Sequence, residues 1–298
     1  MQTIRLVHFS DLHITTPRLG WRRRDYLSKR VTGWLNLRLL GRGYRFRHAN
    51  RAAAAMMRQV TDRPPDHLIF SGDATALAFE AEFAQAARLL GVGKPNMPPG
   101  LAVPGNHDYY VGRPVRDRLF ERYFAPWQVG QRIDSHHYPF AQRVGHVWLI
   151  GVNSSITTFW TWDATGFVGP AQRQRLRQLL DALEPGPRIL VTHYPLARSR
   201  GQRERLFHGL RDWREMIRIA AEGGVSLWLH GHIHKPFVLH AERVAPFPVI
   251  CVGSGTQTHV WTYNEYLITG HRLAMTRRRY SLSEDAFHDQ DVLELDLR

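Results

Sequence analysis

Five short apolar runs, each followed by side chains that can bind a metal ion, constrain the fold of this 298-residue chain more than any other feature. The runs cover residues 4–7, 67–70, 101–103, 189–192 and 225–229. Acid, amide or imidazole side chains follow each run within a few residues. Because the strands of an open α/β sheet place their carboxyl ends along one crevice, side chains at those ends converge on one site. The pattern therefore predicts an α/β fold with a metal site at the strand ends.

Helical spacing of apolar residues fills the intervals between these runs. It predicts helices over residues 51–61, 79–90, 170–183 and 212–221, with Asn50 and Asp212 as N-terminal caps. Two further apolar strands are expected at 146–152 and 247–252, and the tail from residue 265 alternates as antiparallel edge strands do. We expect one domain over residues 1–298, with two facing sheets and the helices outside them.

The chain is strongly basic, with a formal net charge of +14. Only Lys29, Lys94 and Lys235 among its 40 basic residues are lysines, and the planar fork of arginine suits phosphate. A codon preference for arginine explains the choice between the two residue types but not the net charge. An anionic partner is therefore expected: nucleic acid, a nucleotide or a membrane surface.

Two observations bear on localisation. Cys251 is the only cysteine, so no internal disulfide can form and a reducing compartment is expected. No apolar stretch approaches the roughly 20 residues that span a bilayer, and the strand-like run at residue 4 leaves no room for a signal peptide. We expect a cytoplasmic protein that could associate peripherally with the cytoplasmic face of the membrane.

Residues 18–48 form a basic insertion between the first two runs. It carries ten basic residues and one acid, Asp25, interleaved with aromatic and leucine side chains. Leu27, Val31, Trp34 and Leu35 would share one helical face, although Gly33 weakens the helix. Such a helix can rest on an anionic membrane surface. The alternative is a solvated insertion that packs its aromatic side chains on the body. Either way, its place in the sequence predicts a rim or lid over the site.

The side chains after the runs match the needs of a centre with two divalent ions. Such a centre takes a bridging carboxylate with flanking nitrogen and oxygen ligands. The candidates are Asp11, His13, Asp73, Asn106, His193, His232 and His234. No pair of them has the i, i+4 spacing of a zinc-protease helix. His8 and His67 lie inside strand-like runs, where a packing role is expected.

The motifs that carry these residues resemble, in order and interval, those of the calcineurin-like metallophosphoesterase superfamily. They are Asp11-Leu12-His13, Gly72-Asp73, Gly105-Asn106-His107-Asp108, Thr192-His193 and Gly231-His232-Ile233-His234. Any one of them is a weak signal, whereas five in series over nearly the whole chain are specific. The resemblance implies a four-layer sandwich of two facing mixed β-sheets flanked by helices, with a dimetal site at the carboxyl ends of strands.

The resemblance also implies roles for single residues. Asp11, His13 and His234 would hold the first ion. Asn106, His193 and His232 would hold the second ion, and Asp73 would bridge the two. His107 would lie beside the leaving group as a proton donor or a partner of a phosphate oxygen. Asp108 would orient the His107 ring.

These expectations combine into a hydrolytic mechanism. A hydroxide shared by two ions would attack phosphorus, and the ions would take up charge on the phosphate oxygens. Manganese, iron and zinc all suit this ligand set, so the sequence does not choose among them.

Several substrates fit this chemistry. The insertion favours a lipid-linked pyrophosphate of the UDP-diacylglucosamine type, because such enzymes use a basic, apolar-lined lid at the membrane. A cyclic nucleotide or another phosphodiester is the alternative, and nucleic acid would suit the charge. A non-catalytic interaction scaffold on the same fold is the third reading, although every expected ligand is present.

Overall fold

Two six-stranded mixed sheets face each other at the centre of the molecule. The computed structural model describes residues 2–297, so Met1 and Arg298, at the ends of the predicted domain, lie outside the described residues. The first sheet has the order β12-β11-β10-β1-β2-β3, and the second has the order β4-β5-β6-β7-β9-β8. In the first, β1 (Ile4–Phe9), β2 (His67–Phe70) and β3 (Gly100–Ala102) are parallel. The strands β10 (Thr262–Thr269), β11 (Arg272–Ser281) and β12 (Ala286–Asp296) extend it in antiparallel fashion.

The second sheet has a parallel centre with an antiparallel strand at each edge. The centre contains β5 (Val147–Gly151), β6 (Arg188–Val191), β7 (Val225–His230) and β9 (Val249–Cys251). The edges are β4 (Phe140–Val144) and β8 (Phe237–Leu239). Both sheets are thus mixed, as predicted, and the tail after residue 265 forms the expected antiparallel strands.

Alternating side chains along the strands explain why four layers form. Leu6 and Ile69 of the first sheet pack with Ile189 and Leu227 of the second in a core between the sheets. The neighbouring residues on these strands point the other way, because successive side chains of a strand face opposite sides. Phe70 packs toward the helices of the first outer layer, and residues such as Leu190 and Trp228 pack toward those of the second.

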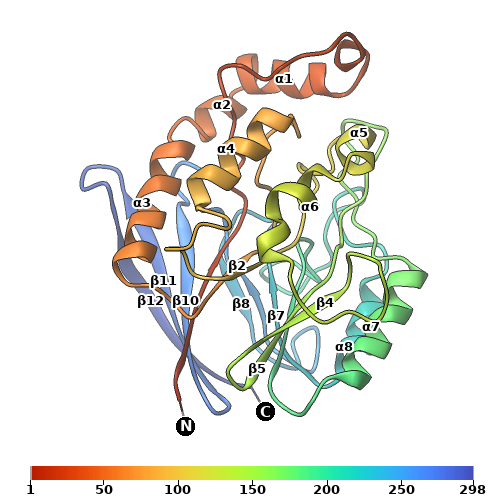
Figure 1. Ribbon diagram of the computed structural model, residues 1–298, viewed down its shortest axis with the longest axis vertical. Helices are drawn as coiled ribbons and strands as arrows, with labels where there is room; N and C mark the ends of the chain where they lie inside the picture. The colour runs from red at the N-terminus through yellow and green to blue at the C-terminus, as the bar shows by residue number, and fades with distance from the viewer. Residues whose placement is uncertain (1, 298) are drawn as a thin grey trace.

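Helices cover the outer face of each sheet, as Figure 1 shows. α3 (Ala49–Asp62), α4 (Glu80–Leu90), α5 (Gly112–Arg116), α6 (Leu119–Phe124) and the 3-10 turn η2 (Ala125–Trp127) lie on the side of the first sheet. α7 (Pro170–Ala182) and α8 (Trp213–Glu222) lie on the second. Neither expected cap closes its helix with a side-chain hydrogen bond. The N-cap of α3 is His48 instead of Asn50, and the carboxylate of Asp212 accepts from the backbone of Val168 and Gly169.

The insertion lies beyond the sandwich, above the end at which β1 stops and opposite the chain termini (Figure 1). It contains the 3-10 turn η1 (Arg23–Leu27), α1 (Arg30–Leu39) and α2 (Arg42–Arg45). Arg30 and Gly33 are the buried residues of α1, whereas Leu27 and Leu35 are exposed. The prediction that Leu27 and Leu35 belong to a buried apolar face of this helix is therefore wrong. Within residues 2–297, no helix combines the length and apolarity that crossing a bilayer requires.

Candidate metal centre

The ends of five parallel strands bring all seven predicted ligands to one edge of the sandwich. Asp11 and His13 follow β1, Asp73 follows β2 and Asn106 follows β3. His193 follows β6, and His232 and His234 follow β7. Asp11, His13, Asp73 and His193 are fully or almost fully buried. The first sheet thus contributes four of the predicted ligands, and the second sheet contributes three.

Most of these residues have a backbone conformation that L-residues rarely adopt. The positive φ angles are 55° for Asp11, 44° for His13, 59° for Asp73, 67° for His232 and 58° for His234. Each such residue costs free energy and persists only where the surroundings impose it. Because the positive φ angles cluster at the strand ends, we infer that function constrains the direction in which these side chains point.

Two glycines allow the strand ends to approach the acidic side chains. A Cβ on Gly105 would lie 2.1 Å from Asp73 Oδ1, and a Cβ on Gly231 would lie 2.4 Å from Asp11 Oδ2. Real side chains do not tolerate such contacts, so these positions of the motifs require glycine.

The first group of ligand atoms comes from Asp11, His13, Asp73 and His234, and these atoms all lie within 4.8 Å of one another. His234 Nε2 is 3.0 Å from Asp11 Oδ1 and 3.1 Å from His13 Nε2. Asp11 Oδ2 accepts the backbone N–H of His232, whereas the buried Oδ1 has no hydrogen-bond partner. An orphaned, buried carboxylate oxygen that faces two imidazoles fits a cation.

The second group consists of Asn106, His193 and His232. Asn106 Oδ1 lies 3.1 Å from His193 Nε2 and 3.0 Å from His232 Nδ1, and the two ring nitrogens are 3.3 Å apart. The other nitrogen of each ring lies against a backbone carbonyl: His193 Nδ1 is 2.8 Å from Ser71 O, and His232 Nε2 is 3.0 Å from His208 O. A carbonyl only accepts, so those nitrogens carry the protons of neutral rings. Burial, the main cause, lowers the pKa of both histidines.

Three acceptor atoms therefore face one another in the second group. The amide oxygen of Asn106 and the unprotonated nitrogens of His193 and His232 have no hydrogen to share. Acceptors at such distances repel unless a cation lies among them, and this donor set suits a divalent ion. The carbonyls of Ser71 and His208 fix the tautomers of His193 and His232. Metal-bound histidines in proteins usually have such a hydrogen-bond partner on the nitrogen that does not bind the metal.

Asp73 joins the two groups. Its Oδ1 accepts the backbone N–H of His107 at 2.7 Å. Its Oδ2 lies 3.6 Å from His13 Nε2 in the first group and 3.5 Å from His193 Nε2 in the second. Burial and the nearby charge of Asp11 raise the pKa of Asp73 well above its usual value. Burial opposes ionisation of Asp11 too, but His234 holds the pKa of Asp11 at about 2. Two buried carboxylates in one site need positive charge to balance them.

His107 and Asp108 have different surroundings from those expected. His107 Nδ1 donates to Ala76 O at 2.8 Å, so a carbonyl orients the ring. Asp108 is fully buried and accepts the backbone N–H groups of Gly105, Ala74 and Thr75. The carboxylate therefore joins the turns after β2 and β3, and no hydrogen bond connects it to the His107 ring among the described residues.

Two histidines outside the ligand set, His8 and His67, pack as expected. His8 Nε2 lies 2.8 Å from Ser71 Oγ, and burial lowers the pKa of His8 to about 3. His67 hydrogen-bonds Gln142, and the buried His230 contacts the carbonyl of Gly231.

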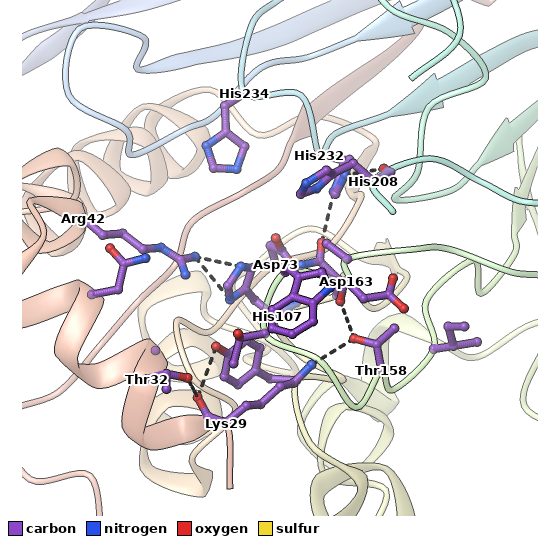
Figure 2. A pocket seen from close by; sticks show the side chains of 18 of the residues that line it. Lys29, Thr32, Arg42, Asp73, His107, Thr158, Asp163, His208, His232 and His234 are labelled. Atoms are coloured by element: carbon purple, nitrogen blue, oxygen red, sulfur yellow. Dashed lines mark hydrogen bonds between the residues drawn. The ribbon is translucent and has the colours of Figure 1, made fainter. Parts of the chain in front are cut away.

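A cleft of about 520 Å³ opens from the metal groups toward the insertion. Asp73, Asn106, His107, His232 and His234 lie at its base. Its walls come from Lys29, Asn36, Leu40 and Arg42 of the insertion and from residues 156–164. Figure 2 shows Arg42 reaching across from α2 to His107, and Lys29 pointing to Thr158 on the other wall.

Sequence reasoning missed several residues that touch the site. Gln257 Oε1 lies 2.6 Å from His234 Nδ1, and the carbonyl of His208 receives a hydrogen bond from His232. Arg42 contacts His107 and His13. None of these belongs to a motif or follows a predicted strand directly, so spacing gave no signal for them.

Comparison with known proteins shows that calcineurin-like phosphoesterases and dimetal phosphatases have a similar fold. A family model for calcineurin-like phosphoesterases matches residues 4–236. The fold is similar to that of a dimetal phosphatase from Danio rerio, with 10% identity, a TM-score of 0.70 and 99% of each chain covered. It is also similar to a purple acid phosphatase from yellow lupin (Lupinus luteus) seeds, with 12% identity, a TM-score of 0.64 and coverage of 99% of this chain and 54% of that chain. No curated protein sequence matches the chain.

Proposed function

This chain belongs to the calcineurin-like phosphoesterase family and is a metal-dependent phosphoester hydrolase; from that premise, we propose how its residues divide the work. Asp11, His13 and His234 would hold one divalent ion, and Asn106, His193 and His232 would hold the other. Asp73, which lies between the two groups, would be the ligand that they share. The observation that carries this assignment is the position of Asp73 Oδ2, 3.6 Å from His13 Nε2 and 3.5 Å from His193 Nε2.

When bound, the two ions activate a water for attack on phosphorus and take up negative charge on the phosphate oxygens. The protein residues position the groups around this chemistry. The backbone N–H of His107 occupies Asp73 Oδ1, which leaves Oδ2 for the centre. Asp108 binds three backbone N–H groups and so holds the turns that carry Asp73 and Asn106. We therefore assign Asp108 a positioning role, whereas His107, which lines the cleft, lies beside the phosphoryl or leaving group.

The substrate we favour is a lipid-linked pyrophosphate of the UDP-diacylglucosamine type. One large apolar side chain stands exposed on each wall of the cleft, Leu40 on the insertion and Trp162 opposite. Their sequence neighbours Leu39, Phe159 and Trp160 are exposed as well. Monomeric proteins rarely expose such groups together unless a partner covers them. The basic residues of the insertion beside them would suit an anionic membrane surface. A small cyclic nucleotide, the alternative, gives no reason for this rim.

A panel of phosphoesters tests the activity and the substrate together. Purified protein would be assayed with manganese, iron or zinc on bis-p-nitrophenyl phosphate, a cyclic nucleotide and UDP-diacylglucosamine. We expect turnover of the generic ester with at least one metal and the highest kcat/KM for the lipid-linked pyrophosphate. Absence of turnover on every ester in metal-loaded protein would contradict the proposal, and a preference for the cyclic nucleotide would replace the favoured substrate.

Membrane contact has its own test with a matched control. Leu40 and Val292 are similarly exposed, at 76% and 71%, but only Leu40 lies on the cleft rim. A Leu39→Ser/Leu40→Ser variant should bind anionic vesicles at least about tenfold more weakly in co-sedimentation, since each leucine contributes apolar burial. Val292→Ser should bind as the unmodified protein does. Equal binding of all three proteins, or no binding by any, contradicts the membrane proposal.

A further inference from the structure

Arg42 places a guanidinium group in the metal cleft. It lies on α2, within the insertion, and its Nη2 is 2.8 Å from His107 Nε2 and 3.2 Å from His13 Nδ1 (Figure 2). It lines the same cleft as Asp73, Asn106 and His234. The insertion therefore contributes a charged group to the base of the site as well as a rim above it.

Arg42 lacks the acid partner that two other inward-facing arginines, Arg30 and Arg173, have in the described part of the chain. Arg30 pairs with Asp25 at 2.6 Å, and Arg173 pairs with Asp212 at 2.7 Å. Among the described residues, no carboxylate lies within ion-pair distance of Arg42. Burial lowers the pKa of Arg42, and the nearby charge of Asp73 opposes this effect only in part. A desolvated guanidinium is normally matched by an anion, so Arg42 is suited to bind an anionic group that enters the cleft.

The present partners of Arg42 are replaceable. His107 donates through Nδ1 to Ala76 O, so its Nε2 accepts from Arg42, and both ring nitrogens are occupied. An imidazole nitrogen is a neutral acceptor, whereas a phosphate oxygen is charged and forms a shorter, stronger bond with a guanidinium. An anion that enters the cleft would therefore take the Arg42 hydrogen bonds and release His107 Nε2.

We infer that Arg42 is a substrate-binding residue that donates hydrogen bonds to a non-bridging oxygen of the phosphoryl group beside the metal centre. The inference rests on the proposed function, because it concerns the same site. It assigns the insertion a direct part in phosphate recognition. Lys29, the second cation of the cleft, comes from the same insertion, and its Nζ donates to Thr158 Oγ1 across the cleft.

The test compares Arg42→Met with Arg45→Met. Arg45 lies on the same short helix, is exposed and forms no side-chain hydrogen bond among the described contacts, so it controls for lost charge in the insertion. Inorganic phosphate is the probe, with its dissociation constant measured by calorimetry on metal-loaded protein. kcat/KM on bis-p-nitrophenyl phosphate, metal content and thermal unfolding are measured in parallel.

Arg42→Met should weaken phosphate binding and lower kcat/KM by about 10- to 100-fold, the range of one charge-assisted hydrogen bond. Arg45→Met should stay within about twofold of the unmodified protein. Arg42→Lys should recover part of the loss, since an ammonium keeps the charge without the fork. Unchanged phosphate affinity in a folded Arg42→Met variant with full metal content overturns the inference.

Two further outcomes are distinguishable. If Arg42→Met does not fold, Arg42→Gln is compared with Arg45→Met instead. Unchanged phosphate affinity in the Arg42→Gln variant overturns the inference equally. If the unmodified protein turns over no ester, the proposed function fails, but phosphate affinity still decides whether Arg42 binds the anion.

Discussion

Single residues set how closely the strand ends approach one another, and Gly105 is the sharpest case. Gly105→Ala would place a Cβ 2.1 Å from Asp73 Oδ1 and 2.4 Å from Asp73 N. We expect the free energy of unfolding to fall by about 1–3 kcal/mol, as overpacking does, with loss of activity because Asp73 must move. Gly112→Ala is the control, since its Cβ would meet only Arg116 Nη1 at 3.7 Å. Chemical denaturation measures both, and equal stabilities would contradict the geometry.

Residues that hydrogen-bond to the predicted ligands should also affect metal binding. Gln257 Oε1, 2.6 Å from His234 Nδ1, fixes the ring so that Nε2 faces Asp11 and His13. Gln257→Ala should reduce metal affinity or activity by about 10- to 100-fold, as loss of an outer partner does. Gln257→Glu keeps an acceptor and should retain most of both. Metal titration by calorimetry checks this, and tight binding by the alanine variant would rule out the role.

The ligands were predictable at this scale because five motifs mark them, and the structure brings all seven together. Arg42 and Gln257 were not, because each reaches the site from a segment whose path the sequence does not specify. The neighbour of the His107 ring was also missed. Which carbonyl lies behind an imidazole depends on a turn conformation, here that of residues 73–76.

At the scale of elements, the buried Arg30 of α1 joins the insertion to the body through its contacts with residues 77–79, and a buried ion pair within the insertion holds its guanidinium in place. Arg30 pairs with Asp25, donates to the carbonyls of Leu77 and Ala78, and lies 4.0 Å from the ring centre of Phe79. Breaking a buried pair leaves an uncompensated charge, which costs about 3–5 kcal/mol. This contact sets where α1 and α2, and therefore Arg42, stand over the cleft.

Arg30→Met should loosen the insertion without unfolding the sandwich. We expect much faster amide hydrogen exchange over α1 and lower activity, with unchanged exchange in β1 and β6. Arg38→Met on the same helix serves as the control, because Arg38 contacts the ring of Trp34 and has no ion-pair partner within residues 2–297. Protected α1 amides in Arg30→Met would show that other contacts hold the insertion.

The same helix shows why amphipathic patterns fail on insertions. The sequence favoured a face with Leu27, Val31, Trp34 and Leu35, but α1 buries Gly33 against the body, and of these four side chains Trp34 packs on the core. A Cβ there would lie 2.6 Å from Leu77 Cδ2 and 2.7 Å from the Tyr110 hydroxyl, so glycine permits close packing. Strand periodicity was more informative, since each strand has a buried side set by its neighbours.

For the whole molecule, the shared core between the sheets determines how it unfolds. Leu149 of the second sheet packs in the cluster that contains Leu6 and Ile69 of the first. Leu149→Ala should lower the free energy of unfolding by about 2–5 kcal/mol and increase exchange in both sheets together, which is the behaviour of one domain. Calorimetry should give one transition. Two transitions, or exchange that changes only in the second sheet, would contradict a single domain.

The account depends most on a centre that Asp73 shares between two ions. The direct measurement is the number of metal ions bound per chain, determined by elemental analysis after reconstitution, for the unmodified protein and Asp73→Asn. We predict two ions for the unmodified protein, one or fewer for Asp73→Asn, and at least about a thousandfold loss of turnover, because several kcal/mol of charge stabilisation disappear. A folded Asp73→Asn variant that keeps two ions and full turnover would contradict the account.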